Sequence, residues 1–458
     1  MFKRILVANR GEIAVRIIRA CREMNIETVA VYSDADKGAL FTCLASRAVC
    51  IGGARSDESY LNVNNLISTA LLCECDAIHP GYGFLSENAD FARLVTESGL
   101  VFIGPPAEVI SAMGDKSTAK RIMKEGGVPV VPGSDGLVSN IDEAKKIAEE
   151  VGYPVFVKAT AGGGGRGMCL VHTPEQLEPS FQSASEEAKM FFGNGGVYIE
   201  KLIEEPRHIE VQILADNYGN VIHLGERDCT MQRRNQKMLE ESPASILTEN
   251  SRSELCKAAV NAAKQAGYRG AGTVEFVLGK DGKFYFIEMN TRLQVEHPVT
   301  EMVTGIDIVR AQIQIASGQP LKFKQEDVVL RGHAIECRIN AEDPANGFCP
   351  CPGTVQDIHL PGGYGLRIDT GIYSGSEISP YYDAMVAKVI VYGNTRGEAI
   401  RRMRRALEEC IISGIKTNIP LLYMLFYNPD YISNNISTSF IQNNLDNMLD
   451  AIKESEIK

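Results

Sequence analysis

The first hundred residues alternate between strand and helix patterns, and this alternation constrains the fold more than any other feature. Arg4–Ala8 is a short apolar run, after which Ile13, Ile17 and Ala20 recur at helical spacing. Glu27–Tyr32 then has the pattern of a second strand. Repeated strand–helix units form an open parallel sheet, in which ligands bind beyond the carboxyl ends of the strands. The sequence therefore predicts an α/β domain with a ligand site at one edge of a parallel sheet.

The chain has 458 residues, which is too long for one compact core, so we expect two to four packed domains. A shift to Gly, Pro and Val over Gly126–Gly136 predicts a domain boundary. Beyond it, a helix is predicted over Ile141–Val151 and two strands over Pro154–Lys158 and Gly167–Val171. The glycine run Gly162–Gly165 separates these strands, and this arrangement predicts a small flap.

The remainder of the chain is predicted to contain mainly strands with alternating apolar and polar residues. The predicted strands are Ala77–His79, Leu100–Ile103, His208–Leu214, Val221–Glu226, Gly272–Leu278, Lys283–Glu288, His333–Asn340 and Ala384–Tyr392, and the predicted helices are Ser253–Ala266 and Thr395–Ile412.

Charge and cysteine content narrow the class of protein. The net charge of −11 argues against nucleic acid as a partner, because phosphate backbones require a basic face. No apolar window is long enough for a secretory signal or a membrane span, so we expect a cytoplasmic protein. The twelve cysteines lack zinc-site spacing and are expected to be buried free thiols in a reducing compartment. Examples within apolar runs are Cys21, Cys50, Cys169 and Cys410.

The glycine run is the first feature that indicates chemistry. Gly162, Gly164 and Gly167 fit G-x-G-x-x-G, but a strand follows where a dinucleotide site requires a helix. A glycine-rich hairpin tip can instead fold over phosphates, because its backbone N–H groups approach the oxygens closely. Lys158 beside it and Lys116 upstream are candidate phosphate ligands, with solvated surface lysines as the alternative interpretation.

Two glutamates interrupt otherwise apolar strands. Glu275 and Glu288 occupy such positions, and Asn290 follows the second strand closely. A buried carboxylate is unfavourable unless it is paired or binds a cation, so these oxygens suit Mg²⁺ bound to a nucleotide. Solvent-facing glutamates on half-exposed strands are an equally good interpretation of the spacing alone.

Several further polar residues are candidates for substrate chemistry. Arg292 has the donor fork to bind a small planar anion, and Glu296 beside it is a candidate general base. Arg338 lies on an alternating strand and is expected to point into a cleft, whereas Arg233 and Arg234 fit surface charges.

Taken together, these segments resemble the biotin carboxylase family of ATP-grasp enzymes over essentially the whole chain. The similarity is carried by ILVANRGEIAVRIIRA at 5–20, HPGYGFLSEN at 79–88, GDKSTAK at 114–120, AGGGGRGM at 161–168, EPRHIEVQ at 205–212, ERDCTMQRRNQK at 226–237, EMNTRLQVEHPVTE at 288–301 and GHAIECRINAED at 332–343.

The resemblance implies a mixed α/β and α+β architecture: an ATP-grasp fold with an N-terminal open parallel-sheet domain, a small glycine-loop lid and a large C-terminal antiparallel-sheet domain. The expected divisions are an N-terminal domain at 1–113, a linker and mobile lid at 114–203, a catalytic core at 204–330 and a C-terminal domain at 331–446.

The resemblance also implies a role for each matching residue. ATP would contact Lys116, Lys158, Gly162, Gly163, Gly164, Gly165, Glu200, Lys201, Ile203, His208, Gln232, Glu275 and Glu288. Mg²⁺ or Mn²⁺ would bind Glu275, Glu288 and Asn290; bicarbonate and biotin would contact Lys237, Arg292, Gln294, Val295, Arg338 and Tyr82; and Glu296, Arg338, Arg292 and Lys237 would be catalytic.

In the implied reaction, Glu296 deprotonates bicarbonate, which attacks the γ-phosphate of ATP to give carboxyphosphate. This intermediate breaks down to CO₂ and phosphate, the phosphate removes the N1 proton of biotin, and Arg338 stabilises the resulting enolate. Asn235 stands where many members of the family carry histidine, which leaves the contribution of that position to the nucleotide site open.

The chain has no Met-Lys-Met biotin-attachment signature, so biotin is expected on a separate biotin carboxyl carrier protein. The resemblance favours the biotin carboxylase subunit of bacterial acetyl-CoA carboxylase, a homodimer that works with carboxyltransferase subunits in fatty acid synthesis. A split pyruvate or acyl-CoA carboxylase uses a similar subunit. Two other functions remain open at this point: a different ATP-grasp ligase, and a nucleotide-binding regulatory subunit without turnover.

Overall fold

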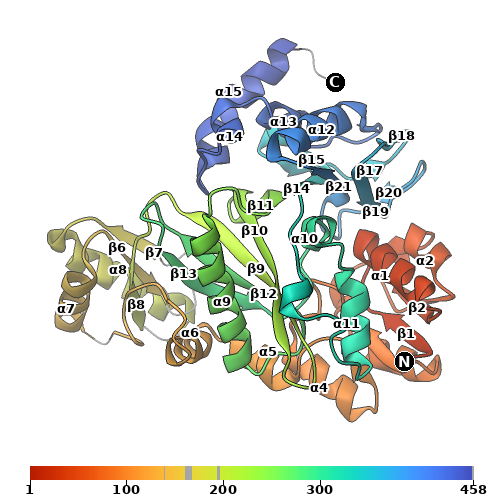
Figure 1. Cartoon of the computed structure of the whole chain (residues 1–458), viewed down its shortest axis with the longest axis horizontal. Coiled ribbons are helices and arrows are strands. Elements are labelled where there is room, and N and C mark those ends of the chain that lie inside the picture. Colours follow the sequence, from red (N-terminus) through yellow and green to blue (C-terminus); the bar gives the residue numbers. More distant parts are fainter. Residues whose placement is uncertain (139, 160–167, 193–195, 456–458) are drawn as a thin grey trace.

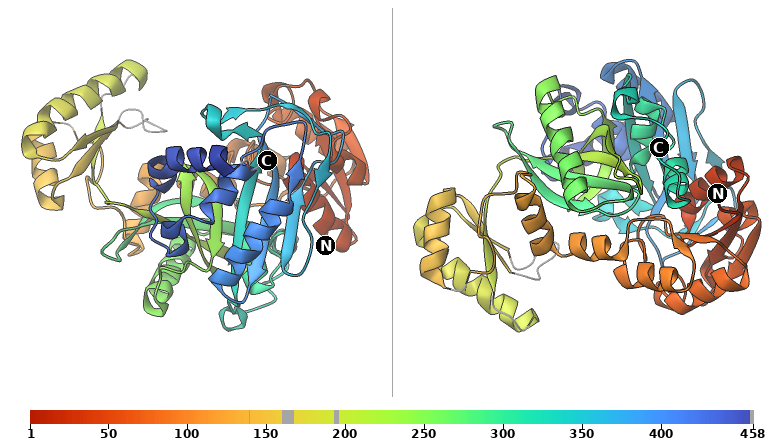
Figure 2. Two further views of the ribbon diagram at one scale, coloured as in Figure 1. Left: turned by 90° about the horizontal axis from the view of Figure 1, so that it is seen from above. Right: turned by 60° about the horizontal axis from the view of Figure 1, so that its bottom comes forward.

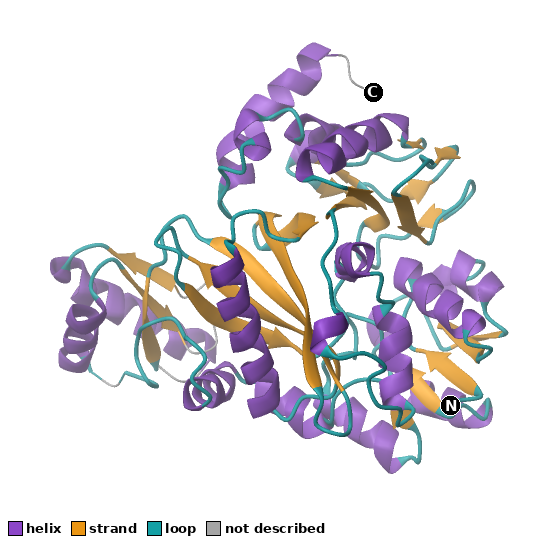
Figure 3. Ribbon diagram, viewed as in Figure 1, coloured by secondary structure: helices purple, strands orange, loops and turns teal. Residues whose placement is uncertain are grey.

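The protein is described by a computed structural model that covers residues 1–138, 140–159, 168–192 and 196–455. An N-terminal parallel-sheet domain, a small three-stranded sheet and a long antiparallel sheet form its three main regions (Figures 1 and 3). Two further views show that the small sheet projects from the rest of the molecule (Figure 2). The predicted combination of fold types is therefore confirmed.

The N-terminal domain is a doubly wound parallel sheet of five strands in the order β3-β2-β1-β4-β5. Because β2 and β4 flank β1 on opposite sides, the strand order reverses at β1, which is where such sheets bind ligands. The strands are β1 (Arg4–Val7), β2 (Glu27–Tyr32), β3 (Arg47–Cys50), β4 (Ala77–His79) and β5 (Val101–Phe102), and the helices are α1 (Gly11–Glu23), α2 (Leu40–Leu44), α3 (Val63–Leu72), α4 (Ala89–Glu97) and α5 (Ala107–Gly114).

The carboxyl ends of β1 and β4 are joined by one buried side chain. The amide Nδ2 of Asn9, just after β1, donates hydrogen bonds to the carbonyl oxygens of Pro80 and Tyr82, both at 2.7 Å. Gly81 between them has φ +64°, and a Cβ there would lie 2.9 Å from Asn9 Nδ2. Glycine is therefore required at this turn, which places Tyr82 at the edge of the sheet.

The small region contains the sheet β7-β6-β8, in which both strand pairs are antiparallel. Its apolar core is separate from those of the other regions. The pairing of β6 with β7 confirms the predicted strand pair, whereas Gly162–Gly165 lie outside the described residues. Its elements are α7 (Ile141–Val151), β6 (Val155–Ala159), β7 (Met168–Val171), α8 (Pro174–Phe192) and β8 (Val197–Lys201), and α6 (Lys116–Glu125) precedes them.

The largest sheet has eight antiparallel strands in the order β13-β12-β9-β10-β11-β14-β21-β19. It continues across residue 331, where a domain division was expected, because β11 pairs directly with β14. The strands are β9 (Arg207–Ala215), β10 (Val221–Arg233), β11 (Gln236–Ser242), β12 (Gly270–Leu278), β13 (Phe284–Asn290), β14 (His333–Asn340), β19 (Leu366–Thr370) and β21 (Met385–Gly393).

Helices cover both faces of this sheet, and three separate two-stranded sheets lie in the C-terminal part of the described chain. The helices are α9 (Glu249–Gln265), α10 (His297–Thr304), α11 (Ile308–Ala316), α12 (Arg396–Glu409), α13 (Ile419–Leu425), α14 (Pro429–Ile432) and α15 (Phe440–Ser455); the short strands are β15 (Glu342–Asp343), β16 (Cys349–Pro350), β17 (Gly353–Thr354), β18 (Ile358–His359), β20 (Glu377–Ile378) and β22 (Ile411–Ile412).

The two-residue period of the strands separates an apolar face from a charged one. On β9, Ile209 and Val211 pack into a core with α9, so Glu210 between them points to the opposite face. On β14, Cys337 belongs to the core beneath α12, so Arg338 points away from that core. Charged residues thus share one face of the sheet, and α10 and the N-terminal domain cover that face.

Three predictions require correction. Strand β10 extends to Arg233 instead of ending at Glu226, because pairing with β11 continues to Gln236. Helix α12 ends at Glu409, since Ile411–Ile412 pairs as strand β22 with β18. Cys50 is exposed rather than buried because it lies on β3 at the sheet edge, and Cys169 is only half-buried. Among the described residues, no helix has the length and apolarity needed to cross a bilayer.

Candidate active site

A cleft of about 1150 Å³ lies between the N-terminal domain, the charged face of the large sheet and β6. This volume slightly exceeds the range of about 300 to 1,000 Å³ for small-molecule sites, so the cleft has room for more than one substrate. Most of the predicted site residues line it: Tyr82, Lys158, His208, Gln232, Lys237, Glu275, Glu288, Asn290, Arg292, Gln294, Val295 and Arg338.

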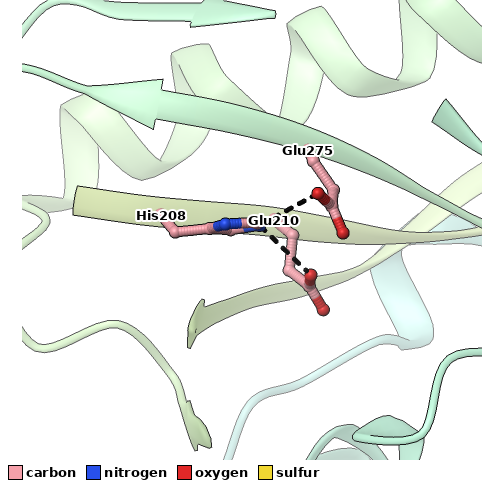
Figure 4. Close-up of side chains that lie close together, drawn as sticks. All are labelled: His208, Glu210 and Glu275. Carbon is pink, nitrogen blue, oxygen red and sulfur yellow. Dashed lines mark ion pairs between the residues drawn. The ribbon is translucent and has the colours of Figure 1, made fainter. Parts of the chain in front are cut away.

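One half of the cleft contains a histidine between two glutamates (Figure 4). His208 Nε2 lies 3.1 Å from Glu275 Oε2 and 3.7 Å from Glu210 Oε2. Burial lowers the pKa of His208, but the charge and hydrogen bond of Glu275 together with the charge of Glu210 raise its pKa overall. His208 and Glu210 both point to the charged face of β9, and Glu275 comes from the neighbouring strand β12. The two carboxylates therefore favour the protonated form of the imidazole in this half of the cleft.

Glu275 and Glu288 are directly opposite each other on β12 and β13. Burial and the negative charge of Glu275 raise the pKa of Glu288, which shows that two carboxylates compete for this space. A divalent cation between them would remove that repulsion, so the donor set fits Mg²⁺. Asn290 lies at the end of the same strand, where its Oδ1 accepts a hydrogen bond from Arg292 Nη2 at 3.0 Å.

The phosphate candidates occupy two places. Lys158 on β6 lines the cleft and forms an ion pair with Glu200 on β8, and the carboxylate of Glu200 also lies 3.4 Å from Lys120 Nζ. Lys116 begins α6 and lines a second cavity of about 190 Å³, which it shares with Glu288 and Asn290.

Three predicted nucleotide contacts, Glu200, Lys201 and Ile203, line neither the large cleft nor the second cavity. The ammonium of Lys201 donates to the carbonyl oxygens of Gly152 and Tyr153, both at 2.8 Å. Glu200 is occupied by its lysine partners, and Ile203 lies beyond the end of β8. The side chain of Lys201 is thus turned to the small sheet rather than to the cleft.

The other half of the cleft is organised around Lys237 on β11. Its Nζ donates to Glu210 at 2.5 Å, to Glu296 at 2.7 Å and to Glu275 at 2.9 Å. Burial lowers the pKa of Lys237, but its three carboxylate partners raise the pKa well above the ordinary value. This single ammonium therefore links the two halves of the cleft electrostatically.

Glu296 is fully buried between two cations. Arg338 Nη2 lies 3.1 Å from Glu296 Oε2 and 2.5 Å from Glu240 Oε1. Burial raises the pKa of Glu296, but Lys237 and Arg338 hold it well below its usual range. The carboxylate is thus ionised, and an anion that shares the two cations would increase its basicity.

Arg292 is held in place on every side of its guanidinium. Its Nε donates to Glu87 at 2.8 Å, and its Nη1 donates to Gln294 Oε1 at 2.8 Å. Gln294 in turn donates to Glu275 at 3.1 Å. The predicted anion-binding residues are therefore connected to the predicted metal ligands by hydrogen bonds.

Tyr82 reaches the cleft from the N-terminal domain, where its hydroxyl donates to Glu12 on α1. Elsewhere at the cleft, the hairpin between β10 and β11 turns through Arg234 and Asn235, which have φ values of 48° and 65°. Asparagine adopts this left-handed conformation readily, and a two-residue hairpin requires it at both positions. Asn235 therefore has a backbone role in addition to lining the cleft.

Sequence reasoning missed several charged residues of this site. Glu210, Arg227, Glu240 and Lys388 are all fully buried, and Glu87 and Glu12 anchor Arg292 and Tyr82. A charged residue inside an apolar strand was the signal that identified Glu275, and Glu210 in IEVQ and Lys388 in VAKVIV carry the same signal. Cys229 was also missed; its thiol lies 3.9 Å from Glu296 Oε1.

The antiparallel sheet, the projecting small sheet and the facing glutamates define an ATP-grasp ligase. Family models agree: "Biotin carboxylase, N-terminal domain" matches residues 1–110, "Carbamoyl-phosphate synthase L chain, ATP binding domain" matches 115–324, and "Biotin carboxylase C-terminal domain" matches 336–443. The chain belongs to the biotin carboxylase family and is an ATP-dependent carboxylating ligase.

Individual relatives cover nearly the whole chain. A biotin carboxylase of Nostoc sp. is 57% identical over 96% of this chain and 99% of its own length. The biotin carboxylase domain dimer of Hydrogenobacter thermophilus 2-oxoglutarate carboxylase, solved with MgADP and bicarbonate, is 51% identical with a TM-score of 0.89, covering 97% of this chain and 98% of its own. A biotin carboxylase subunit of pyruvate carboxylase is 51% identical with a TM-score of 0.89, covering 98% and 99%.

Proposed function

We propose that this enzyme uses ATP to transfer the carbon of bicarbonate to biotin on a separate carrier protein. The observation that carries the proposal is the cluster of Lys237, Glu296 and Arg338, a buried base held between two cations. The paired glutamates of β12 and β13 lie in the same cleft. The half of the cleft with the paired glutamates (the nucleotide half) suits ATP, and the half around Lys237 and Glu296 (the base half) holds a base. This combination suits activation of a small acid by ATP.

The nucleotide half would hold ATP through residues of three elements. Lys158, His208 and Lys116 supply positive charge for phosphate oxygens, and Gln232 contributes an amide. Glu275 and Glu288, with Asn290, would hold Mg²⁺ or Mn²⁺, which neutralises the phosphoryl group during transfer. The resemblance adds Glu200, Lys201 and Ile203 near the adenine and Gly162–Gly165 over the phosphates, and residues 114–203 as a lid that excludes water.

The base half would activate bicarbonate. Arg292, Gln294, Lys237 and the backbone of Val295 surround the anion, while Glu296 removes its proton. The bicarbonate oxygen then attacks the γ-phosphorus, the bond to ADP breaks, and carboxyphosphate forms. Because Lys237 contacts both Glu275 and Glu296, it is suited to stabilise charge on both sides of this transfer.

Biotin would bind where Tyr82 and Arg338 face the cleft. Carboxyphosphate breaks down to CO₂ and phosphate, and the phosphate accepts the N1 proton of biotin. Arg338 stabilises the negative charge on the ureido oxygen, and N1 forms its bond to CO₂. The partner of Arg338 in the structure, Glu240, is fully buried and keeps the guanidinium in position.

We further infer that the physiological pathway is acetyl-CoA carboxylation in the cytoplasm, with a biotin carboxyl carrier protein and carboxyltransferase subunits as partners. Relatives of similar identity belong to 2-oxoglutarate and pyruvate carboxylases, so the acceptor requires an experiment of its own. A homodimer is proposed because the 2-oxoglutarate carboxylase relative was solved as a dimer.

The first experiment measures phosphate release from ATP and Mg²⁺, with and without bicarbonate and free biotin. We expect bicarbonate-dependent turnover that biotin stimulates and that Glu296→Gln abolishes. Glu241→Gln is the matched control, because this glutamate is buried like Glu296 but bonds to His333 and Arg396 instead of Lys237 and Arg338. ATP binding without biotin stimulation would contradict the proposal and support another ligase or a regulatory role.

The second experiment identifies the acceptor. The enzyme is incubated with purified carrier protein, carboxyltransferase and labelled bicarbonate, together with acetyl-CoA, pyruvate or 2-oxoglutarate. Label in malonyl-CoA supports the acetyl-CoA assignment, whereas label in a product of either keto acid replaces that assignment and leaves the carboxylation of biotin intact.

A further inference from the structure

A lysine that no proposed step uses lies at the centre of the charged face. Lys388 is on β21, where it is the cross-strand partner of both Arg338 on β14 and Asp369 on β19. Its side chain is completely buried. Its neighbours Ala387 and Val389 point into the apolar core beneath α12, so strand alternation directs Lys388 to the side of the cleft.

The ammonium of Lys388 contacts three segments that are far apart in the sequence. Its Nζ donates to the carbonyl oxygen of Val295 at 2.9 Å. It lies 3.1 Å from Glu12 Oε1 on α1 and 3.9 Å from Asp369 Oδ2 on β19. Lys388 therefore joins the loop before Glu296 to the N-terminal domain and to the C-terminal end of the sheet.

Each of the two closer contacts leads to a proposed substrate group. The Val295 carbonyl belongs to the peptide unit that precedes Glu296, so the hydrogen bond from Lys388 fixes the backbone orientation of the base. The same Oε1 atom of Glu12 also accepts the hydroxyl hydrogen of Tyr82. A continuous chain of contacts thus runs from the base through Lys388 and Glu12 to the biotin side of the cleft.

Fold stability alone does not account for this lysine. Replacement of a whole buried ion pair by apolar residues of similar volume is often neutral or stabilising, so stability does not require a charged group at this position. The next residue on the same face of β21, Ile390, is apolar and fully buried, so the stem of a methionine fits there. A substitution of Lys388 alone leaves Glu12 and Asp369 without their cation, so the unfolding free energy of each variant is measured beside its activity. The groups facing Lys388 are Glu12, Asp369, Glu336, Arg338, Arg367 and His297.

We propose that Lys388 is a positioning residue that sets the distance between the base Glu296 and Tyr82 on the biotin side of the cleft. This inference rests on the proposed function and adds to it the device that aligns the two half-sites. Loss of the link leaves bicarbonate and ATP free to react while biotin is misplaced. The expected defect is ATP cleavage that is uncoupled from the formation of carboxybiotin.

Two substitutions separate the contributions of Lys388. Lys388→Met keeps the stem and removes both the charge and the donor, whereas Lys388→Gln keeps a donor for the Val295 carbonyl. We expect kcat/KM for free biotin to fall about tenfold to a hundredfold in Lys388→Met, because misplacement by about 1 Å has effects of that size. Lys388→Gln should retain more of the kcat/KM for biotin, and bicarbonate-dependent ATP cleavage and the affinity for ATP should remain those of the wild type in both.

A double-mutant cycle with Tyr82→Phe tests the chain of contacts and requires only variants that fold. Tyr82→Phe removes one hydroxyl at the far end of the chain, and Lys388→Gln breaks its centre. If the chain positions biotin, the double variant will lose less biotin kcat/KM than the product of the single losses, since groups in one network are not additive. Arg396→Gln serves as the control for destabilisation, because its partner Glu241 lies outside the cleft.

The outcomes distinguish this inference from the proposed function. A wild-type enzyme without biotin-stimulated turnover contradicts the proposed function itself. A wild-type enzyme with such turnover, together with Lys388 variants of unchanged carboxybiotin yield per phosphate, overturns the inference alone. Strictly multiplicative losses in the cycle overturn it as well.

Discussion

Two charged regions of the cleft differ in how their ion pairs are arranged. One is the wall, the face of the large sheet that carries Glu210, Arg227, Lys237 and Glu336; the other is the small sheet opposite it. On the wall, Lys237 contacts three carboxylates and Arg227 and Glu210 are completely buried. On the small sheet, Lys158 contacts one carboxylate, and the two side chains are 34% and 22% exposed. The wall is a connected network of buried charges, whereas Glu200 on the small sheet pairs with Lys158 and Lys120 and all three side chains remain partly open to water.

This difference indicates that the wall and the small sheet have different functions in the site. Strand alternation places the wall charges on one face, and each of them is fixed by partners on neighbouring strands, so their positions do not depend on a ligand. The partners of Lys158 are few and solvent competes for them, so a phosphate can replace Glu200 at low cost. The wall therefore supplies preorganised charge for the chemistry, and the small sheet supplies a cation for nucleotide binding.

The largest effect is expected from Lys237→Gln on the wall. Its three carboxylate partners would lose their common cation, and the proposed transfer would lose charge stabilisation on both sides. Turnover should fall about a hundredfold to a thousandfold, as for removal of other preorganised donors. Steady-state phosphate release in the presence of bicarbonate and biotin measures the loss. A fall of less than about tenfold would show that the wall is not the catalytic region.

The second prediction compares stability. Arg227→Met removes one of the two buried cations beside Glu210, at 2.5 Å, and also removes donors to Thr273 and Thr300. Breaking such a buried pair costs about 3 to 5 kcal/mol of unfolding free energy. Urea titration followed by circular dichroism will measure the change in unfolding free energy between the wild type and the variant. A change below about 1 kcal/mol would place the wall in the same class as surface ion pairs.

The third prediction concerns the pH dependence of folding stability, which should have opposite signs in the two regions. Burial raises the pKa of Glu336 on the wall well above its ordinary value, and among the described residues neither of its carboxylate oxygens has a hydrogen-bond partner. The folded protein therefore keeps this proton above pH 4.5 while the unfolded chain releases it, so stability falls as pH rises toward the folded pKa. Glu336→Gln should gain stability relative to the wild type by up to about 1.4 kcal/mol per pH unit over that window.

Glu200 on the small sheet gives the opposite sign. Although burial raises its pKa, Lys158 and Lys120 together lower it overall, so ionised Glu200 contributes stability above pH 4.5 that is lost as pH falls through the folded pKa. Glu200→Gln should therefore be slightly less stable than the wild type at neutral pH and equal to it in acid. Thermal unfolding from about pH 2.5 to 8 measures both variants, with the acid end reporting on Glu200 and the neutral end on Glu336, and curves of the same sign would contradict the comparison.

The sequence predicted most elements of the fold because the periodic signals are local. Helix Ile141–Val151 and strands Glu27–Tyr32 and His333–Asn340 have the predicted limits. The continuity of the large sheet across residue 331 was not predictable from periodicity, since it depends on pairing between β11 and β14, strands more than ninety residues apart.

The site shows the same limit at the level of single residues. Glu275 was recognised as a candidate because its carboxylate interrupts an apolar strand and a second glutamate lies nearby in the sequence. Lys388 interrupts a strand in the same way, but its partners Glu12 and Val295 are remote in the sequence. Local pattern thus identifies an unusual charge, and only the fold identifies the groups that it contacts.

The smallest effect on stability is expected from Lys158→Met. Exposed pairs contribute about 0 to 1 kcal/mol, so the unfolding free energy should change by no more than about 1 kcal/mol. The KM for ATP should nevertheless rise about tenfold, which corresponds to the loss of about 1.4 kcal/mol of binding. Lys145→Met, which removes an exposed pair with Glu178 on the outer helices of the same region, is the matched control and should change neither quantity. Equal effects of the two substitutions on the KM for ATP would show that Lys158 acts as an ordinary surface lysine. The small sheet would then have no role in nucleotide binding that distinguishes it from the wall.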